Sequence, residues 1–291
     1  MLVGFPPGGG TDLTARMLGQ KFTESWGQNV VVDNRSGAGG NIATDIVAKA
    51  VPDGHTLLMA VSSIAINPSL YPKLPYDTMK DLAPISMVAA APNIIVAHPS
   101  FPANTLRDVI AAAKGKPGQI TYASPGAGQA SHLAMELLGI MTSTQFVHVP
   151  YNGGGPSVVA ALSGQTNLLV GAMPTVLPHV RSGKLKVMAV TSAKRTQLAA
   201  DLPTVAESAA LQGYEADVWY GLLAPAGTPP AIIQKLNAEV ARVLQLREIR
   251  ERLMTLGFEP FHNSPAQFTA LMKSEIAKWE KVVKQSGAKV D

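Results

Sequence analysis

Short apolar runs alternate with longer amphipathic stretches along most of this chain. The apolar runs predict buried strands at residues 30–32, 56–61, 93–97, 120–123, 146–149, 168–170, 187–190 and 218–223. The stretches between them predict helices at residues 13–22, 41–50, 106–113, 133–138 and 156–162. Strands that alternate with helices are typical of a mostly parallel sheet with helices on its faces. The pattern therefore predicts an α/β fold.

Two longer helices are predicted after the last strand. The first begins near Thr228 and Pro229, because threonine suits the N-cap and proline the first helical position. The second begins at Ser264, three residues before Gln267, which is the spacing of a capping box. Its apolar residues from Phe268 to Val283 recur at helical spacing and are interpreted as facing the core.

The strand–helix pattern occurs in two rounds, which predicts two lobes. Residues 1–98 form the first segment of lobe 1, residues 99–220 form lobe 2, and residues 221–291 return to lobe 1 with the C-terminal helices. Each lobe is expected to hold a mostly parallel sheet flanked by helices. The chain would cross between the lobes on two apolar strands, and two crossings form a hinge.

The composition is that of an ordinary globular protein and excludes several classes of function. Of 291 residues, 46% are hydrophobic and 15% are charged. The net charge of +4 comes from dispersed lysines and arginines, so we expect no nucleic-acid partner. The chain has no cysteine, which excludes thiol catalysis and disulfides. Because Met1–Phe5 is interpreted as the end of a strand, we expect that a signal peptide preceded it.

Two glycine-rich turns, one in each predicted lobe, lead from a strand into a helix. The first is Phe5–Asp12 and the second is Ser124–His132. Glycine permits a positive φ and lets a ligand approach the backbone, and the helix N-terminus beyond it offers unpaired N–H donors. The two turns therefore predict an anion site, with a small acid held between two lobes.

Other residues near these turns have a structural and a functional interpretation. Asp12 is interpreted as an organiser of its loop, since a carboxylate inside the pocket would repel an anion. A hydrogen bond to a neighbouring loop is the favoured role of His132, ahead of ligand contact. Ser62 and Ser63 follow a predicted strand, where both ligand contact and helix capping stay open. Gly37–Asn41 is interpreted as a plain turn.

Nucleotide and hydrolase motifs are incomplete. Gly126–Ser131 approximates the dinucleotide fingerprint, but the strand after it ends in Pro150–Asn152, without an acid to hold a ribose. The first turn lacks the Gly-Lys-Ser/Thr ending of a phosphate-binding loop. Neither a nucleophile elbow nor a His-Glu-x-x-His metal motif occurs. We therefore expect no cofactor and no metal, and a hydrolase using the same anion-binding turns is the alternative function.

Further motifs run in order through the chain. They are Phe5–Gly9 with Asp12, Val31–Asn41, Pro52–Leu58, Ala65–Pro68, Leu74–Asp77, His148–Tyr151, Leu202–Glu207 and Gly221–Pro229. In this order they resemble the motifs of the Bug family, also called TctC-like solute receptors, the extracytoplasmic binding components of tripartite tricarboxylate transporters. The resemblance extends from Phe5 to the C-terminus.

This resemblance implies a two-lobed periplasmic-binding-protein fold of the second type, a location in the periplasm, and no catalysis. It implies a small carboxylate as ligand and the membrane subunits of such a transporter as candidate partners, and we expect a monomer. The candidate ligand-binding residues are Gly8, Gly9, Gly10, Thr11, Ser62, Ser63, Ser124, Gly126, Gly128, Gln129, Ser131, Gly171 and Ala172.

The chain departs from the family pattern at two places that bear on the ligand. Pro125 and Ala127–Gln129 stand where polar residues are common, and Val170–Met173 replaces a stretch that often contains Phe-Asp-Asn. Gly171 and Ala172 carry no charge to offset a ligand ammonium, and burying an unpaired ammonium costs several kcal/mol. We therefore expect a dicarboxylate or an aromatic carboxylate, with an apolar body beside Gly171, and both transport and sensing stay open as its purpose.

Overall fold

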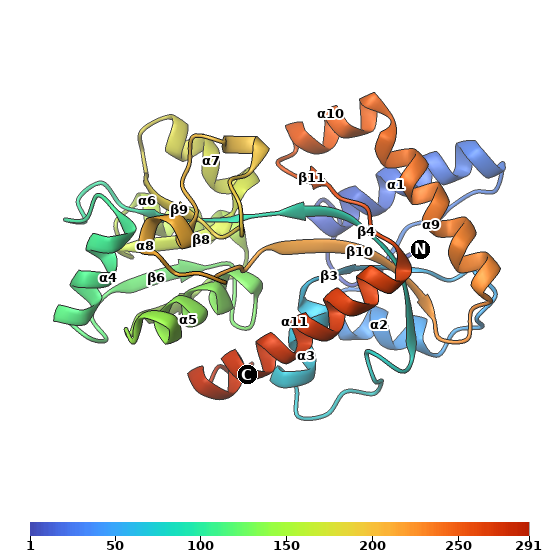
Figure 1. Ribbon diagram of the computed structural model, residues 1–291, viewed down its shortest axis with the longest axis horizontal. Coiled ribbons are helices and arrows are strands. Elements are labelled where there is room, and N and C mark those ends of the chain that lie inside the picture. Colours follow the sequence, from blue (N-terminus) through green and yellow to red (C-terminus); the bar gives the residue numbers. More distant parts are fainter. Residues whose placement is uncertain (291) are drawn as a thin grey trace. The chain divides into compact units, whose positions relative to one another are not determined.

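The computed structural model describes residues 1–290 and divides into two compact units (Figure 1). Unit 1 comprises Met1–Ala90 and Trp219–Glu280. Unit 2 comprises Ala91–Val218 and the chain end from Lys281. The lobe boundaries predicted at residues 98/99 and 220/221 stay a prediction.

Unit 1 is built on a six-stranded sheet in the order β11-β4-β10-β3-β1-β2. Its strands are β1 (Leu2–Val3), β2 (Asp33–Asn34), β3 (Leu58–Val61), β4 (Leu82–Ala91), β10 (Val218–Pro225) and β11 (Glu259–Pro260). β1 runs parallel to β2 and β3, whereas β10 runs antiparallel to β3 and β11 runs antiparallel to β4. The carboxyl ends of β1 and β3 therefore meet at one edge of this sheet.

Helices cover both faces of the unit 1 sheet (Figure 1). They are α1 (Gly10–Trp26), α2 (Asn41–Ala48), α3 (Ser63–Leu70), α9 (Pro230–Gln245), α10 (Arg247–Thr255) and α11 (Pro265–Ser286), with a 3₁₀ turn at Ala38–Gly40. Two neighbours on β10 identify the faces. A Cβ on Gly10 of α1 would meet Tyr220 at 2.5 Å, and one on Gly221 would meet Phe268 of α11 at 2.3 Å. α1 and α11 thus pack on opposite faces, because successive strand residues point to opposite sides.

Unit 2 is built on a five-stranded sheet in the order β7-β6-β8-β5-β9. Its strands are β5 (Asn93–Ala97), β6 (Thr121–Ser124), β7 (Val147–Pro150), β8 (Leu168–Ala172) and β9 (Lys186–Val190). β6 lies parallel to β7 and β8, and β5 lies antiparallel to β8 and β9. The helices are α4 (Leu106–Gly115), α5 (Ala130–Thr142), α6 (Gly154–Leu162), α7 (Met173–Arg181) and α8 (Val205–Ala209), with a 3₁₀ turn at Gln197–Ala199.

The predicted α/β fold is confirmed, but both sheets are mixed where mostly parallel sheets were expected. The difference comes from β5 and β10, which run antiparallel to their neighbours. The predicted buried strand at residues 30–32 is wrong: Val31 is 64% exposed, and the edge strand is the pair Asp33–Asn34. β4 has ten residues and was not predicted.

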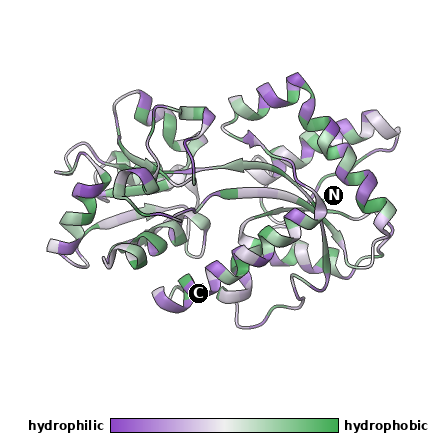
Figure 2. Cartoon of the chain, viewed as in Figure 1, coloured by the Kyte–Doolittle hydropathy of each residue, from purple (hydrophilic) through white to green (hydrophobic). Residues whose placement is uncertain are grey.

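Hydrophobic residues follow the strands and the inner stripes of the helices, while the outer stripes are hydrophilic (Figure 2). The predicted capping box of α11 is present, since Ser264 Oγ accepts from the Gln267 amide and Gln267 Oε1 from the Ser264 amide. α9 begins one residue later than predicted, with Pro229 at its N-cap. No helix among residues 1–290 combines the length and apolar character needed to cross a membrane.

Candidate functional site

The loop between β1 and α1 is held in shape by Asp12. The Gly8 amide donates to Asp12 Oδ2 at 2.9 Å, with Gly8 at a φ of 85°. Asn34 Nδ2 donates to Asp12 Oδ1 at 3.0 Å, and Arg16 Nε donates to Oδ2 at 2.9 Å. Asp12 is only 2% exposed. The predicted role of Asp12 as the organiser of this loop is confirmed.

Asp12 remains ionised despite its burial. Burial by itself would raise its pKa, but the hydrogen bonds from Arg16, Gly8 and Asn34 together with the Arg16 charge hold the pKa below its ordinary value. Both oxygens of this carboxylate thus accept hydrogen bonds from groups of unit 1. The Asp12 charge therefore supports the backbone and is balanced by Arg16.

The N-terminus of α1 is left without a side-chain cap. Its N-cap is Gly9, in extended conformation at a φ of −79°, and no side chain accepts a hydrogen bond there. The amides of the first helical turn have no acceptor inside an α-helix. Thr105 and Thr204 close such ends with capping boxes at α4 and α8, whereas α2, α3, α6, α7, α9 and α10 also lack a side-chain cap. The open α1 terminus can therefore donate to an anion.

The two predicted serines differ. Ser62 directly follows β3, at the sheet edge where the parallel strand β1 also ends, and it is 2% exposed. Its Oγ has no hydrogen-bond partner and does not cap α3. Ser63 Oγ donates to the Gly39 carbonyl at 3.2 Å. Asn67 also donates to that carbonyl, at 3.1 Å, so the Gly37–Asn41 turn packs against α3. Of the two, Ser62 retains an unused hydroxyl.

Trp219 was not among the predicted site residues. Its carbonyl accepts from the Ser62 amide at 2.9 Å, so the two residues lie opposite each other at the end of β3 and the start of β10. The indole is 4% exposed, and Nε1 has no hydrogen-bond partner. Its position on the second strand predicted to cross between the lobes indicates a place close to the hinge and the cleft, and this stays a prediction. Ser62 Oγ and Trp219 Nε1 are thus two buried polar groups without hydrogen-bond partners, and they belong to residues joined by a backbone hydrogen bond.

The loop between β6 and α5 in unit 2 is built around Ser124. Ser124 is fully buried, and its Oγ lies 2.6 Å from His148 Nε2 and 3.1 Å from the Gly126 carbonyl. The Gly126 amide donates back to the same Oγ at 3.2 Å. The Ser124 hydroxyl is therefore occupied within the loop. Its predicted ligand contact stays a prediction.

His132 supports the same loop from α5. The Gly128 amide, at a φ of 72°, donates to His132 Nδ1 at 3.0 Å. The favoured prediction for His132, a hydrogen bond to a neighbouring loop, is confirmed. The N-cap of α5 is Gln129, and its side chain makes no cap hydrogen bond. The α5 terminus is thus open in the same way as that of α1, and Ser131 lies buried in its first turn.

Three stacked rings, those of His132, His148 and Tyr122, lie next to this loop. The His132 and His148 rings stack at 3.9 Å, and Tyr122 stacks on His148 at 4.9 Å. The Tyr122 hydroxyl donates to Glu136 Oε1 at 2.9 Å, and His132 Nε2 lies 3.6 Å from the same oxygen. Since Nδ1 of His132 accepts from Gly128, the proton of the neutral ring is on Nε2, toward Glu136.

Burial and charge fix the protonation of this row. Burial, together with repulsion from His132, lowers the pKa of His148 to about 4. Burial opposes ionisation of Glu136, but hydrogen bonds from His132 and Tyr122 hold its pKa below the ordinary value. Burial raises the pKa of Tyr122. At neutral pH the row therefore consists of a neutral His148, a phenol and a carboxylate.

Gly171 and Ala172 end β8, next to β6 and at the same sheet edge as Ser124. A Cβ on Gly171 would lie 2.9 Å from Val176 Cγ2. Met173 is fully buried in the core of unit 2, together with Val176. The expectation of free space for an apolar ligand group beside Gly171 is therefore wrong on the side that a Cβ would occupy, because core side chains fill that space. Contact of Gly171 or Ala172 with a ligand stays a prediction.

No group of three or more His, Asp or Glu side chains within residues 1–290 could hold a metal ion. The model of the tripartite tricarboxylate transporter family receptor, TctC, matches residues 14–288. The protein belongs to this family.

Relatives cover nearly all of this receptor. Protein BugT of Bordetella pertussis is 39% identical over 292 residues, which is 100% of this chain and 89% of BugT. A Rhodopseudomonas palustris protein solved with adipate is 36% identical, covers 99% of this chain and 97% of its own, and has a TM-score of 0.85. MatC from the same species, solved with bound malate, is 32% identical over 97% of both chains, with a TM-score of 0.79.

These findings establish a solute-binding receptor of the periplasm with the two-lobed periplasmic-binding-protein fold. The family is one of receptors and not of enzymes, so the hydrolase alternative is set aside. The Ser124–His148 pair has the separation of a nucleophile and a base, but Ser124 is buried within its own loop. That pair supports the loop.

Proposed function

We propose that this TctC receptor binds a small dicarboxylate or aromatic carboxylate and delivers it to the membrane subunits of a tripartite tricarboxylate transporter. The proposal rests on where two of the uncapped helix N-termini lie, that of α1 in unit 1 and that of α5 in unit 2. Each follows a glycine-rich loop at the carboxyl end of a parallel strand. Helix N-termini of this kind bind carboxylates through backbone amides and the helix dipole.

In unit 1 the donors would be the backbone amides of Gly9, Gly10 and Thr11. Gly8 already gives its amide to Asp12, so its part in binding is to shape the turn. Ser62 Oγ would add a hydroxyl, since it is buried without a partner at the neighbouring strand end. Ser63 would act through its backbone, because its hydroxyl is bonded to Gly39.

In unit 2 the donors would be the amides of Gln129 and Ser131 together with the Ser131 hydroxyl. The Gly128 amide is bonded to His132, and Ser124 and Gly126 are bonded to each other. These three residues would therefore hold the loop in shape for the ligand. Ala172, at the end of β8, would line the ligand at the same sheet edge.

Two observations support the ligand class: the ligands of two relatives, and the lack of an acidic side chain at the end of β8. The relatives named above were solved with adipate and with malate, both of which are dicarboxylates. The β8 end of this chain offers Gly171 and Ala172, neither of which can neutralise an ammonium group. Because an unpaired buried ammonium costs several kcal/mol, acidic amino acids should bind less tightly.

Calorimetric titration of the purified receptor tests the proposal. Adipate, malate and benzoate are compared with aspartate and glutamate at one pH and ionic strength. At least one of the first three should bind at least about tenfold more tightly than either amino acid, a difference of ~1.4 kcal/mol. Absence of heat with all five acids, or tightest binding by aspartate or glutamate, would contradict the proposed ligand class.

A further inference from the structure

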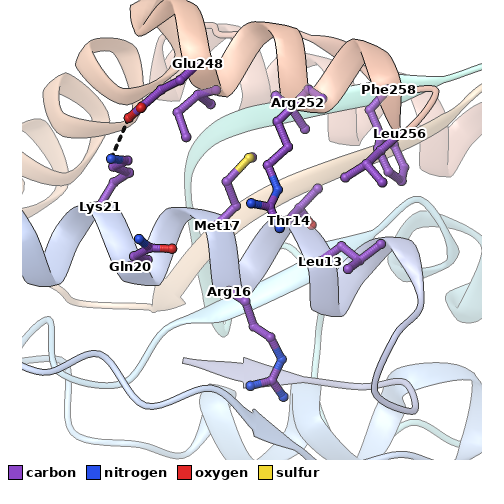
Figure 3. Close-up of a pocket in the computed structure, with 12 residues that line it drawn as sticks. Leu13, Thr14, Arg16, Met17, Gln20, Lys21, Glu248, Arg252, Leu256 and Phe258 are labelled. Carbon is purple, nitrogen blue, oxygen red and sulfur yellow. Dashed lines mark ion pairs between the residues drawn. The ribbon is translucent and has the colours of Figure 1, made fainter.

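A pocket of about 300 Å³ lies in unit 1 between α1 and α10, on the side of α1 that faces α10 (Figure 3). Its volume is at the lower end of the roughly 300–1,000 Å³ typical of ligand pockets. Half of the twelve residues that line it are apolar, namely Leu13, Met17, Ile249, Leu253, Leu256 and Phe258. It belongs to neither of the glycine-rich loops.

The charged residues around this pocket differ in how they are paired. Lys21 bonds to Glu248 at 2.6 Å across the pocket, which neutralises both groups. Arg16 points away from α10 (Figure 3) and is bonded to Asp12 and Asn34. Among residues 1–290, Glu248 is the one carboxylate that lines the pocket. The paired groups leave no excess negative charge at the opening.

Arg252 is the exception among these charges. Its side chain extends from α10 toward Met17 and Thr14 on α1 (Figure 3). No residue in the described part of the chain forms an ion pair or a side-chain hydrogen bond with it. The Thr14 hydroxyl donates to the Gly10 and Thr11 carbonyls, and no hydrogen bond joins it to Arg252. A solvent-exposed guanidinium without an internal partner therefore stands beside the apolar side of the pocket.

We propose that this pocket is a second ligand site, for an amphiphilic monocarboxylate whose carboxylate pairs with Arg252 and whose apolar chain lies against Met17 and Phe258. Guanidinium and carboxylate form two parallel hydrogen bonds, and the apolar wall stabilises a hydrocarbon chain by burial. The site is independent of the proposed function, because none of its lining residues is a candidate for that function.

Octanoate is the probe that tests this site. Calorimetry measures its binding to the intact receptor, and the methyl signal of ¹³C-labelled Met17, assigned with Met17→Leu, reports where it binds. Octanoate should bind and shift the Met17 signal. Arg252→Gln should weaken octanoate binding about fivefold, as expected for loss of an ion pair at an exposed arginine.

Two matched variants separate this site from the carboxylate site of the receptor. Arg250→Gln removes a neighbouring exposed arginine of α10 that does not line the pocket, and it should leave octanoate binding within about twofold of wild type. Gly128→Val alters the unit 2 loop and should also leave octanoate binding unchanged. No octanoate binding, equal binding by the two arginine variants, an unmoved Met17 signal, or loss of binding with Gly128→Val alone would each overturn the proposal. Failure of the proposed function would instead abolish dicarboxylate binding and leave these octanoate results intact.

Discussion

The Gly128 amide donates a hydrogen bond to His132 Nδ1, 3.0 Å away, so this ring nitrogen must be unprotonated while the loop keeps its shape. The same ring stacks on His148 at 3.9 Å. A residue of the glycine-rich loop is thus fixed by a buried imidazole and not by the backbone alone. The geometry of the loop, and with it the open N-terminus of α5, therefore depends on this hydrogen bond.

Replacement of His132 by phenylalanine should weaken ligand binding. The phenyl ring keeps the stacking on His148 but leaves the Gly128 amide without an acceptor, which costs about 1–3 kcal/mol. We expect roughly tenfold weaker binding of the preferred carboxylate by calorimetry. His55→Phe, at an exposed histidine, is the control. Equal affinities of the His132 variant and the control would show that the loop does not need this bond.

The stability of the receptor should fall as the pH is lowered from 6.5 to 4, and His148 should account for part of the fall. Its pKa is about 4 in the folded protein, below the ordinary 6.5, so between these values the unfolded chain binds the additional proton. The contribution is complete above pH 6.5 and is lost below pH 4. For a partly exposed ring it amounts to at most about 2 kcal/mol.

Thermal unfolding from pH 7.5 to 4.5 checks this effect, with His148→Gln beside the wild type. Glutamine cannot titrate, so the stability of the variant should depend less on pH in this range. The two proteins should therefore approach each other in unfolding temperature as the pH falls. Parallel curves over the whole range would rule out His148 as a source of the pH dependence.

Gly9→Val should reduce ligand binding without loss of stability. Gly9 has a φ of −79°, and a Cβ there would meet only the Pro6 carbonyl, at 3.7 Å. The added side chain therefore costs little in the fold but covers the first-turn amides of α1. We expect at least about tenfold weaker carboxylate binding by calorimetry. Gly115→Val, at an equally open glycine in α4, is the control, and a Gly9 variant that binds like this control would remove the α1 loop from the site.

Gly128→Val should instead affect both stability and binding. Gly128 has a φ of 72°, which a β-branched residue adopts only with strain of about 1–3 kcal/mol. The variant should therefore unfold at a lower temperature than wild type and bind the carboxylate more weakly. A variant with wild-type melting temperature and wild-type affinity would contradict the φ of this residue and its place in the site.

Trp219 should report ligand binding through its fluorescence. The Trp219 indole is buried, and its Nε1 has no hydrogen-bond partner. The backbone carbonyl of Trp219 accepts a hydrogen bond from the Ser62 amide, so a ligand near Ser62 alters the surroundings of the indole. Addition of the preferred dicarboxylate should change the emission of wild type but not that of Trp219→Phe, which retains Trp26 and Trp279. An unchanged ligand response in the variant would assign the signal to another tryptophan.

Local chemistry in the sequence determined much of this fold. The apolar run at residues 93–97 became β5 with the predicted bounds, and the Ser264–Gln267 spacing became the cap of α11. Asp12 was predicted to organise its loop, because it stands where an N-terminal side chain caps amide groups and its carboxylate would repel an anionic ligand. Capping and hydrophobic periodicity act over a few residues, so the order of residues is enough to predict them.

Contacts between distant residues were decided only by the tertiary structure. The antiparallel courses of β5 and β10, the His132–His148 stack and the filling of the Gly171 side by Val176 each depend on strand order and helix packing. The exposed run at residues 30–32 shows the same limit, since its three valines suit a buried strand but lie beside the edge of the sheet. An edge position leaves apolar side chains uncovered, and no pattern within the run records which strand lies at the edge.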